Sequence, residues 1–405
     1  MKTSKQDNIL KLSVIIVSYK VKFYIEQCLH SLMRAVDGIE TEVYIVDNHS
    51  EDGSVEYLTQ RFPEFNIISS NRNLGFSRAN NLAIKQCTGE YVLLLNPDTV
   101  LGENVIREVL DFMDAHPKAG GAGVMMLKDT GERAMESRRG VPTPMTAFYK
   151  MSGLGTRYPN SRRFGRYYMS FLPWDKPSRI EIMSGAFCML RHEALDKVGL
   201  LDEDYFMYGE DIDLSYRLLM GGYENWYIPA KILHYKGEST HKSSFRYVHV
   251  FYDAMLIFLR KHYGHISVFI SLPIKIAICF KALLTFVRMQ MHSARKLLGM
   301  VKPRLRVSTL YVFIGTKQHS ETCRLLAKRH GIEMKCVEGS AETLPRGHQG
   351  MDFTPYQRVY ATYDTEVYTY EEIFNIFSEA PQTNVVMGTY NPQTNTLITA
   401  EEVLR

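Results

Sequence analysis

The sequence LSVIIVSY at residues 12–19 is the first strong strand pattern in the chain. Its unbroken run of aliphatic, mostly β-branched residues is typical of a strand buried on both faces of a parallel sheet. Strand-like and helix-like patterns alternate from there to residue 128. We expect strands at 12–18, 42–46, 66–69, 90–95 and 122–128, and helices between them at 23–35, 54–61, 76–86 and 104–115. This alternation predicts a doubly wound α/β domain.

Polar residues follow several of these expected strands. They are Ser18 and Tyr19, then Asp47 and Asn48, then Asn96 to Asp98. In open α/β sheets, ligands bind beyond the carboxyl ends of the strands, so Asp47 lies where a nucleoside would dock. Asp98 could meet a divalent cation bound mainly through substrate phosphates, or it could be an ordinary turn or helix-capping aspartate. Asp47 could likewise belong only to a turn.

A second group of polar residues lies at 206–217, where the sequence reads FMYGEDIDLSYR. Glu210, Asp211 and Asp213 place three carboxylates within four positions. Like charges this close repel, so at least one carboxylate should have a raised pKa, as a general base acting near neutral pH requires. A solvated acidic helix start would have the same composition.

Two further features are weaker on their own. His234 follows an expected strand, but a lone histidine is more often structural than a ligand. The sequence NRNLGF at 71–76 supplies a glycine before a helix, whose N-terminus could face a phosphate group.

The bulk composition indicates an ordinary folded protein. The chain has 405 residues, enough for two or three domains, with 45% hydrophobic and 23% charged residues and a net charge of +4. Its six cysteines lack metal-type spacing and indicate a reducing compartment. The N-terminal apolar run is too short for a signal peptide, so we expect the catalytic part in the cytoplasm. Nucleic acid is a poor candidate partner, because no nucleic-acid-binding fold signature accompanies the basic charge.

Residues 133–179 form a basic and aromatic segment with a looser pattern. Its arginines include Arg157, Arg162, Arg163 and Arg166. The segment could be a solvated loop, or a lid that meets a diphosphate or a lipid headgroup.

Residues 265–287 are strongly apolar but contain Lys275 and Lys281. Basic residues recur every seven positions at Lys281, Arg288, Arg295 and Lys302, so they would line one helix face. We favour a helix lying in the plane of an anionic inner leaflet. A packed soluble helix and a spanning or re-entrant segment remain alternatives.

Several of these motifs, taken in order, resemble one family. The chain resembles the family-2 glycosyltransferases, particularly their rhamnosyltransferase-like branch, over about residues 10–245. The matching sequences are VIIVSY (14–19), VDNHSEDGS (46–54), NRNLGFSRANN (71–81), LLLNPD (93–98), SGAFCMLRHEALDKVGLLDEDYFMYGEDIDLSYR (184–217) and YIPAKILHY (227–235). The ordered set is specific, although each motif singly is not.

The resemblance implies an A-type nucleotide-sugar-binding fold and an inverting transfer. The implied nucleotide-sugar site comprises Ser18, Tyr19, Asp47, Asn48, Asp52, Arg72, Asn73, Gly75 and Asn96. The implied metal ligands, for Mg²⁺ or Mn²⁺, are Asp98 and His234, while Asn96 replaces the first acidic residue of the family's DxD-type motif. The implied catalytic base is Asp211, with Glu210, Ser184, Gly185 and Ala186 on the acceptor side.

The pattern changes again after Pro303. We expect strands at 307–314, 332–337 and 384–387 and helices at 320–330 and 370–378, which together make a small Rossmann-like α/β domain. It weakly resembles the nucleotide-binding-like domain that precedes the catalytic part of bacterial polyprenyl-phosphate sugar transferases. Gly315 is not followed by a full glycine fingerprint, so dinucleotide binding is unsupported and a docking or regulatory role is our interpretation.

These observations give three expected segments: a catalytic domain at 1–245, a basic amphipathic membrane-associating segment at 246–303 and a small α/β domain at 304–405. We expect an inverting glycosyltransferase that uses a dTDP-rhamnose-type or UDP-hexose-type donor in cell-surface polysaccharide synthesis. Its acceptor would be a saccharide or a polyprenyl-diphosphate-linked saccharide, and the enzyme would lie on the inner face of the cell membrane. The alternative is a catalytically silent nucleotide-sugar-binding subunit that recruits partners.

Overall fold

The computed structural model describes residues 10–235, 245–264, 287, 290–291 and 308–405. The predicted in-plane helix, with Lys281, Arg288, Arg295 and Lys302, lies outside these residues. Within the part that the structure describes, no helix has both the length and the hydropathy needed to cross a bilayer.

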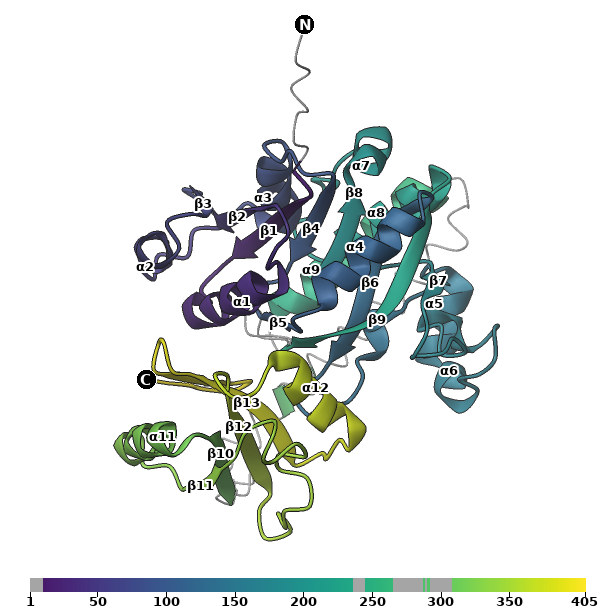
Figure 1. Cartoon of the computed structure of the whole chain (residues 1–405). Coiled ribbons are helices and arrows are strands. Elements are labelled where there is room, and N and C mark those ends of the chain that lie inside the picture. The colour runs from purple at the N-terminus through teal and green to yellow at the C-terminus, as the bar shows by residue number, and fades with distance from the viewer. Residues whose placement is uncertain (1–9, 236–244, 265–286, 288–289, 292–307) are drawn as a thin grey trace, which may run out of the picture.

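The first sheet has nine strands and mixed direction (Figure 1). They are β1 (Leu12–Ser18), β2 (Thr41–Asp47), β3 (Asn66–Ser69), β4 (Tyr91–Leu95), β5 (Thr99–Leu101), β6 (Ala119–Leu127), β7 (Ser178–Ile180), β8 (Phe187–Arg191) and β9 (Glu224–His234). The spatial order is β3-β2-β1-β4-β8-β6-β9-β5, with β7 paired to β9. Strands β3, β2, β1 and β4 are mutually parallel, which is the arrangement that the strand–helix alternation predicts.

The helices of this part include the four that the sequence predicts before residue 128. They are α1 (Lys22–Ala35), α2 (Ser54–Arg61), α3 (Gly75–Ile84), α4 (Val105–Ala115), α5 (Pro144–Met151), α6 (Leu154–Arg157), α7 (His192–Val198), α8 (Glu210–Met220) and α9 (Phe245–Tyr263), with 3-10 turns at Met135–Ser137 and Gly165–Tyr167. The elements predicted up to residue 128 match the observed ones to within three residues at each end.

Both faces of the sheet are buried, and β1 shows why its sequence does not alternate. Ile15 and Val17 belong to one apolar core, and Val14 and Ile16 belong to the core on the opposite face. Each of these side chains is at most 8% exposed. A strand between two cores needs apolar residues at every position, because successive side chains point to opposite faces.

The second half of the sheet brings a distant segment to the strand ends. β8 runs antiparallel to β4 and β6, and β9 runs parallel to β6. The last residue of β9, His234, therefore pairs with Thr99 at the start of β5. This pairing places His234 beside the Asn96–Asp98 turn, although 138 residues separate Asn96 from His234 in the sequence.

Helix α9 packs on the part of the chain that contains the first sheet. His262 Nε2 lies 2.7 Å from Asp213 Oδ1, and Phe258 is 3% exposed in a small core with Val141 and Ile182. Lys261 also forms an ion pair with Asp202. These contacts anchor the first part of the 246–303 segment to α8.

The second sheet has six strands in the order β11-β10-β12-β13-β14-β15. They are β10 (Thr309–Gly315), β11 (Met334–Glu338), β12 (Arg358–Asp364), β13 (Val385–Asn391), β14 (Thr396–Thr399) and β15 (Val403–Leu404), with helices α11 (Lys317–Arg329) and α12 (Tyr370–Glu379). The first four strands in this order are parallel, which confirms a small α/β sheet in the C-terminal region.

The C-terminal sheet docks on the edge of the first sheet through α12 (Figure 1). The carboxylate of Glu103 accepts hydrogen bonds of 2.9 Å from the backbone N–H groups of Tyr370 and Glu371. Lys231 on β9 donates to Asn375 Oδ1 at 2.6 Å. A carboxylate at a helix N-terminus satisfies unpaired donors and the helix dipole together, so Glu103 caps α12 across the interface.

Candidate active site

The carboxyl ends of β1 and β2 hold the first group of predicted residues. Ser18 and Asp47 are direct partners in the parallel register, and Asp47 is 4% exposed. Asp47 Oδ2 accepts the N–H of Ser50 at 3.0 Å, whereas Asp47 Oδ1 and Ser18 Oγ have no hydrogen-bond partner among the described residues. Buried polar atoms without partners call for an explanation, and a ligand that donates to them would satisfy both.

Asn48, Asn73 and Gly75 form one hydrogen-bonded loop. Asn48 Nδ2 donates to Asn73 Oδ1 at 3.0 Å and to the carbonyl of Gly75 at 3.2 Å, while Asn48 Oδ1 accepts the N–H of Leu74 at 2.7 Å. Gly75 has a φ of +78°, and a Cβ there would overlap the carbonyl oxygen of Phe206. Only glycine fits this position without strain, and the fit joins the start of α3 to the loop before Glu210.

Three predicted nucleotide-site residues lie outside that network. Tyr19 is half-buried, and Lys20 lies over its ring. Asp52 is exposed, and its Oδ1 accepts the N–H of Ser54 at 3.0 Å, a local contact at the start of α2. Arg72 is also exposed. The structure brings Asn48, Asn73 and Gly75 together. The contacts given above for Tyr19, Asp52 and Arg72 do not connect those side chains to that loop.

Asp98 and His234, the two residues predicted as metal ligands, lie next to each other. Asp98 Oδ1 lies 3.3 Å from His234 Nε2, and Asp98 is 2% exposed. Two ligand atoms about 2.1 Å from one cation and about 100° apart are separated by about 3.2 Å, so the spacing suits a shared ion. Asn96 Nδ2 is 3.5 Å from the same His234 nitrogen. The Asn96 carbonyl accepts the hydroxyl of Thr99 at 2.7 Å, which shapes the turn.

The three carboxylates at the start of α8 have three different environments. Glu210 is 6% exposed, and burial followed by the nearby charge of Asp211 raises the pKa of Glu210 to about 8. The expected raised pKa therefore falls on Glu210. Asp213 is 1% exposed and pairs with Arg217 and with His262, each at 2.7 Å, so its role is structural.

Asp211 is held from two sides. Its Oδ2 accepts a hydrogen bond of 2.5 Å from Arg139 and one of 3.1 Å from the backbone N–H of Gly185, and its Oδ1 accepts the N–H of Ile212 at 2.8 Å. The Arg139 and Asp211 side chains are each 16% exposed. Arg139 belongs to the segment at 133–179 that the sequence suggests is a loop or a lid. Nothing in the sequence links Arg139 to Asp211, which lies 72 positions later.

The backbone just before these carboxylates is strained. Tyr208 and Gly209 both have positive φ values, of +68° and +84°. A non-glycine residue in this region is costly and persists only where the surrounding structure holds it. The two positive φ values turn the chain sharply just before α8. Helix α8 then begins at Glu210, so Glu210 and Asp211 lie in the first turn of α8.

A short hydrogen-bonded path joins Asp211 to the metal pair. Gly185 donates to Asp211, and the carbonyl of Ala186 accepts the N–H of Asn96 at 3.0 Å. Ser184 Oγ accepts the N–H of Ala186 at 3.4 Å. The Ser184–Ala186 turn thus lies between the acidic helix start and the strand end that carries Asp98. Two backbone contacts of one turn therefore link the Asn96–Asp98 turn with the start of α8, which lie far apart in the sequence.

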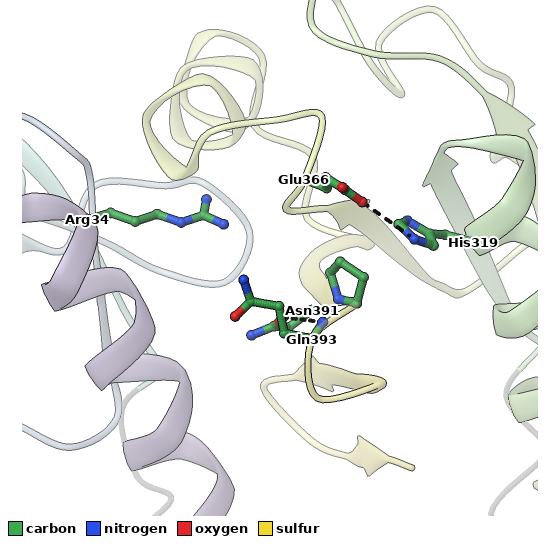
Figure 2. Close-up of a pocket in the computed structure, with 6 residues that line it drawn as sticks. Arg34, His319, Glu366, Asn391 and Gln393 are labelled. Carbon is green, nitrogen blue, oxygen red and sulfur yellow. Dashed lines mark hydrogen bonds and ion pairs between the residues drawn. The ribbon is translucent and has the colours of Figure 1, made fainter. Parts of the chain in front are cut away.

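A separate cavity of about 320 Å³ lies between the two sheets and is shown in Figure 2. Its lining is Arg34 from α1, then His319, Glu366, Asn391, Pro392 and Gln393. His319 Nδ1 is 2.6 Å from Asp364 Oδ2, and its Nε2 is 3.5 Å from Glu366 Oε2. These three residues are grouped closely enough to hold a metal ion.

The pairing of His319 with Asp364 limits this second group. With His319 Nδ1 bonded to Asp364, the imidazole keeps only Nε2 as a ligand atom, and that nitrogen is 3.5 Å from the exposed Glu366. A Cβ at Gly315 would also overlap Asp364, and Asp364 Oδ2 accepts the N–H of Thr316. The chain's own carboxylate therefore occupies the start of α11, where a dinucleotide phosphate would bind in a Rossmann-like domain.

Comparison with known proteins identifies the family to which this chain belongs. The model of glycosyl transferase family 2 matches residues 13–199. The N-acetylglucosaminyl-diphospho-decaprenol L-rhamnosyltransferase of Mycobacterium tuberculosis is 30% identical over 267 residues, covering 62% of this chain and 85% of that protein. Rhamnosyltransferase WbbL of Escherichia coli is 24% identical over 254 residues, covering 58% of this chain and 91% of that protein.

The solved structure of Staphylococcus aureus TarS gives a TM-score of 0.41 at 19% identity, covering 62% of this chain and 40% of that one. The sequence match to the mycobacterial protein spans most of that relative's length. The chain belongs to glycosyltransferase family 2, with that family's A-type α/β fold followed by a second, smaller α/β sheet.

Proposed function

We propose that this chain is an inverting, cation-dependent glycosyltransferase that extends a lipid-linked saccharide during cell-surface polysaccharide synthesis. The observation that carries the proposal is the hydrogen-bonded path from Asp211 through Gly185 and Ala186 to the turn that bears Asp98. Asp211, which Arg139 and Gly185 hold in place, and the pair of Asp98 and His234 would act on one bound donor and acceptor. The names of the mycobacterial and E. coli relatives support a rhamnosyl donor, and the first name supports a polyprenyl-diphosphate acceptor.

The donor would lie along the strand ends. Asp47 and Ser18 would receive the nucleobase, since their buried oxygens lack partners among the described residues. The loop of Asn48, Asn73 and Gly75 would line the nucleotide, and Asp98 and His234 would hold a Mg²⁺ or Mn²⁺ ion. Such an ion, when bound, supplies charge neutralisation for the departing nucleoside diphosphate.

Asp211 would take the proton from the acceptor hydroxyl. Its Oδ2 is occupied by Arg139 and Gly185, whereas Oδ1 accepts one backbone N–H and keeps a second lone pair. Attack by the acceptor oxygen forms the new glycosidic bond as the bond from the anomeric carbon to the diphosphate breaks on the opposite face, which inverts that centre. The proton moves to Asp211, so no covalent enzyme intermediate is needed.

Glu210 would support this chemistry without ionising. With its pKa raised to about 8 by burial and by Asp211, it is mostly protonated near neutral pH. A neutral neighbour spares Asp211 the repulsion of a second charge and leaves a carboxylic acid proton on the acceptor side.

One observation favours a second function, a silent nucleotide-sugar-binding subunit. Asp211 Oδ2 accepts hydrogen bonds from Arg139 and from the backbone N–H of Gly185, as a purely structural carboxylate would. In a silent subunit, Asp211 would only anchor the 138–174 segment through Arg139, and donor binding would serve to recruit partners.

We also propose that the protein works in the cytoplasm on the inner face of the cell membrane. Segment 246–303 and the C-terminal domain at 304–405 would act in attachment and docking, and the catalytic domain would span 1–245. Support comes from the lipid-linked substrate in the mycobacterial relative's name and from the acid-free run between residues 254 and 320.

The experiment is a melting-point screen of sugar nucleotides with and without Mn²⁺. A ligand that binds only the native state stabilises it by about 2.7 kcal/mol at a hundred times its Kd. We expect dTDP-rhamnose or a UDP-hexose to raise the melting point in a cation-dependent way, and turnover of the hit to be lost in Asp211→Asn. If no sugar nucleotide stabilises the protein with or without Mn²⁺, the proposal is wrong. The silent subunit is indicated if a donor stabilises the protein, the wild type shows no turnover, and the wild type and Asp211→Asn recruit partners equally.

A further inference from the structure

Residues 138–174 form a projection that we call the basic lobe. It contains seven Lys and Arg residues and no Asp or Glu. Figure 1 shows its two helices, α5 and α6, standing out at the side of the first sheet next to β7. The lobe is part of the segment whose sequence left open a solvated loop or a lid.

Helix α5 presents an apolar face to solvent. Met145, Phe148 and Met151 are 53%, 56% and 65% exposed, and their spacing of three residues places them on one side of the helix. The opposite side is buried through Thr146 and Tyr149, and the ring of Tyr149 packs on Phe164 with centroids 5.0 Å apart. Single exposed apolar residues are common, but three on one short helix mark a contact surface.

The basic side chains of the lobe fall into two sets. Four are engaged within the protein: Arg138 on Trp174, Arg139 with Asp211, Lys150 over Tyr167 and Arg166 with Glu181. The other three, Arg157, Arg162 and Arg163, are exposed and have no ion pair with a carboxylate among the described residues, although Arg163 Nε donates to the hydroxyl of Tyr149 at 2.9 Å and Arg157 lies over the ring of Tyr158. The apolar face is thus flanked by positive charge that the protein itself does not neutralise.

We propose that α5 lies in the interfacial plane of an anionic lipid bilayer. Met145, Phe148 and Met151 would enter the headgroup–acyl boundary, and Arg157, Arg162 and Arg163 would meet anionic headgroups. An acid-free lobe is complementary to a negatively charged surface. A protein partner whose surface carries both charges could also contact acidic side chains, so it would not explain why the basic lobe contains no Asp or Glu.

The position of the lobe links this surface to the proposed function and deepens it. Arg139, at the start of the lobe, holds Asp211, and Arg166 lies 2.5 Å from Glu181, three residues before Ser184. Asp211 and the strand that leads to Ser184 are therefore tethered to the basic lobe. A lipid-linked acceptor would meet Asp211 from the surface to which α5 binds.

The test is flotation of the full chain with vesicles of phosphatidylcholine alone or with about 30 mol % phosphatidylglycerol. We expect the wild type to bind the anionic vesicles preferentially. The variant Met145→Ser/Phe148→Ser/Met151→Ser should bind roughly tenfold more weakly, and Arg157→Glu/Arg162→Glu should lose the preference for anionic lipid. The matched control is Met220→Ser/Leu325→Ser, because those side chains are 71% and 60% exposed on α8 and α11.

The proposal is wrong if the Met145→Ser/Phe148→Ser/Met151→Ser variant binds anionic vesicles as tightly as the wild type does. Such a result would mean that another segment holds the protein on the vesicle. Equal loss in the control variant also overturns it, as does a second copy of the chain that covers α5 and prevents vesicle binding. Flotation uses no sugar nucleotide, so it is independent of the proposed function: a chain without transferase activity could still float through α5, and an active transferase could fail to float.

Discussion

Glu210 gives the sharpest test of the site's electrostatics, through the variant Glu210→Gln. Glu210 is 6% exposed, its Oε2 has no hydrogen-bond partner among the described residues, and its pKa is raised from 4.5 to about 8. A raised carboxyl pKa means that the folded chain binds more protons than the unfolded chain between these values. Stability from this group is full below pH 4.5 and is lost as the pH rises through about 8.

The magnitude follows from the shift. One pKa unit corresponds to about 1.36 kcal/mol, so the whole shift corresponds to at most about 5 kcal/mol, of which about 3 kcal/mol falls between pH 5.5 and 8.0. The Asp211 charge supplies part of this, and the nearby charge of Arg139 offsets that part. We therefore expect Glu210→Gln to gain about 2 kcal/mol relative to the wild type between these pH values.

The assay is urea unfolding followed by tryptophan fluorescence. Both tryptophans, Trp174 and Trp226, lie in the catalytic part, so the signal reports that part alone. The control is Glu64→Gln, because Glu64 is exposed in the loop before β3. Parallel pH profiles for the wild type and Glu210→Gln would refute the reasoning and would mean that Glu210 is ionised in the folded protein at neutral pH.

Three further predictions follow from single contacts. Gly75→Ala should weaken donor binding roughly tenfold, because a left-handed backbone costs about 1–2 kcal/mol at a non-glycine residue and the added methyl group overlaps Phe206. Calorimetric titration with the donor measures this affinity, and an unchanged affinity would contradict the prediction. Glu103→Ala should lower the protection of the first α12 amides by about 1–2 kcal/mol in hydrogen exchange, since it removes an interdomain cap; equal protection would mean the cap is dispensable. Asp98→Asn and His234→Ala should each abolish the Mn²⁺-dependent part of the melting-point rise with a nucleoside diphosphate, and a retained rise would place the cation elsewhere.

Much of the first sheet follows from its sequence because buried parallel strands leave a local signal. β1 and β4 are continuous apolar runs, and the polar residues at their ends mark the ligand-binding edge. β12 (Arg358–Asp364), by contrast, is central in the second sheet but was not predicted. Its sequence RVYATYD mixes tyrosine, threonine and charge, and its pattern does not reveal that six of its seven residues are buried.

The family resemblance reaches some long-range contacts of the site that local patterns do not. Asp98 and His234, which the resemblance assigns to one metal ion, lie close together because β5 and β9 pair. The ion pair of Arg139 with Asp211 has no local signal, since it depends on how the basic lobe folds back on α8. The structural role of Asp213 did have one, because Arg217 lies four residues later on the same helix face.

The most direct measurement is sugar transfer by Asp211→Asn with the donor found in the melting-point screen. Asparagine keeps an oxygen for Arg139 and Gly185 but cannot take a proton, so geometry and donor affinity should persist. We predict that turnover falls roughly a hundredfold to ten-thousandfold while the donor's Kd stays within about threefold. Turnover near the wild-type rate would contradict the account, because the proton would then leave the acceptor by a route that does not involve Asp211.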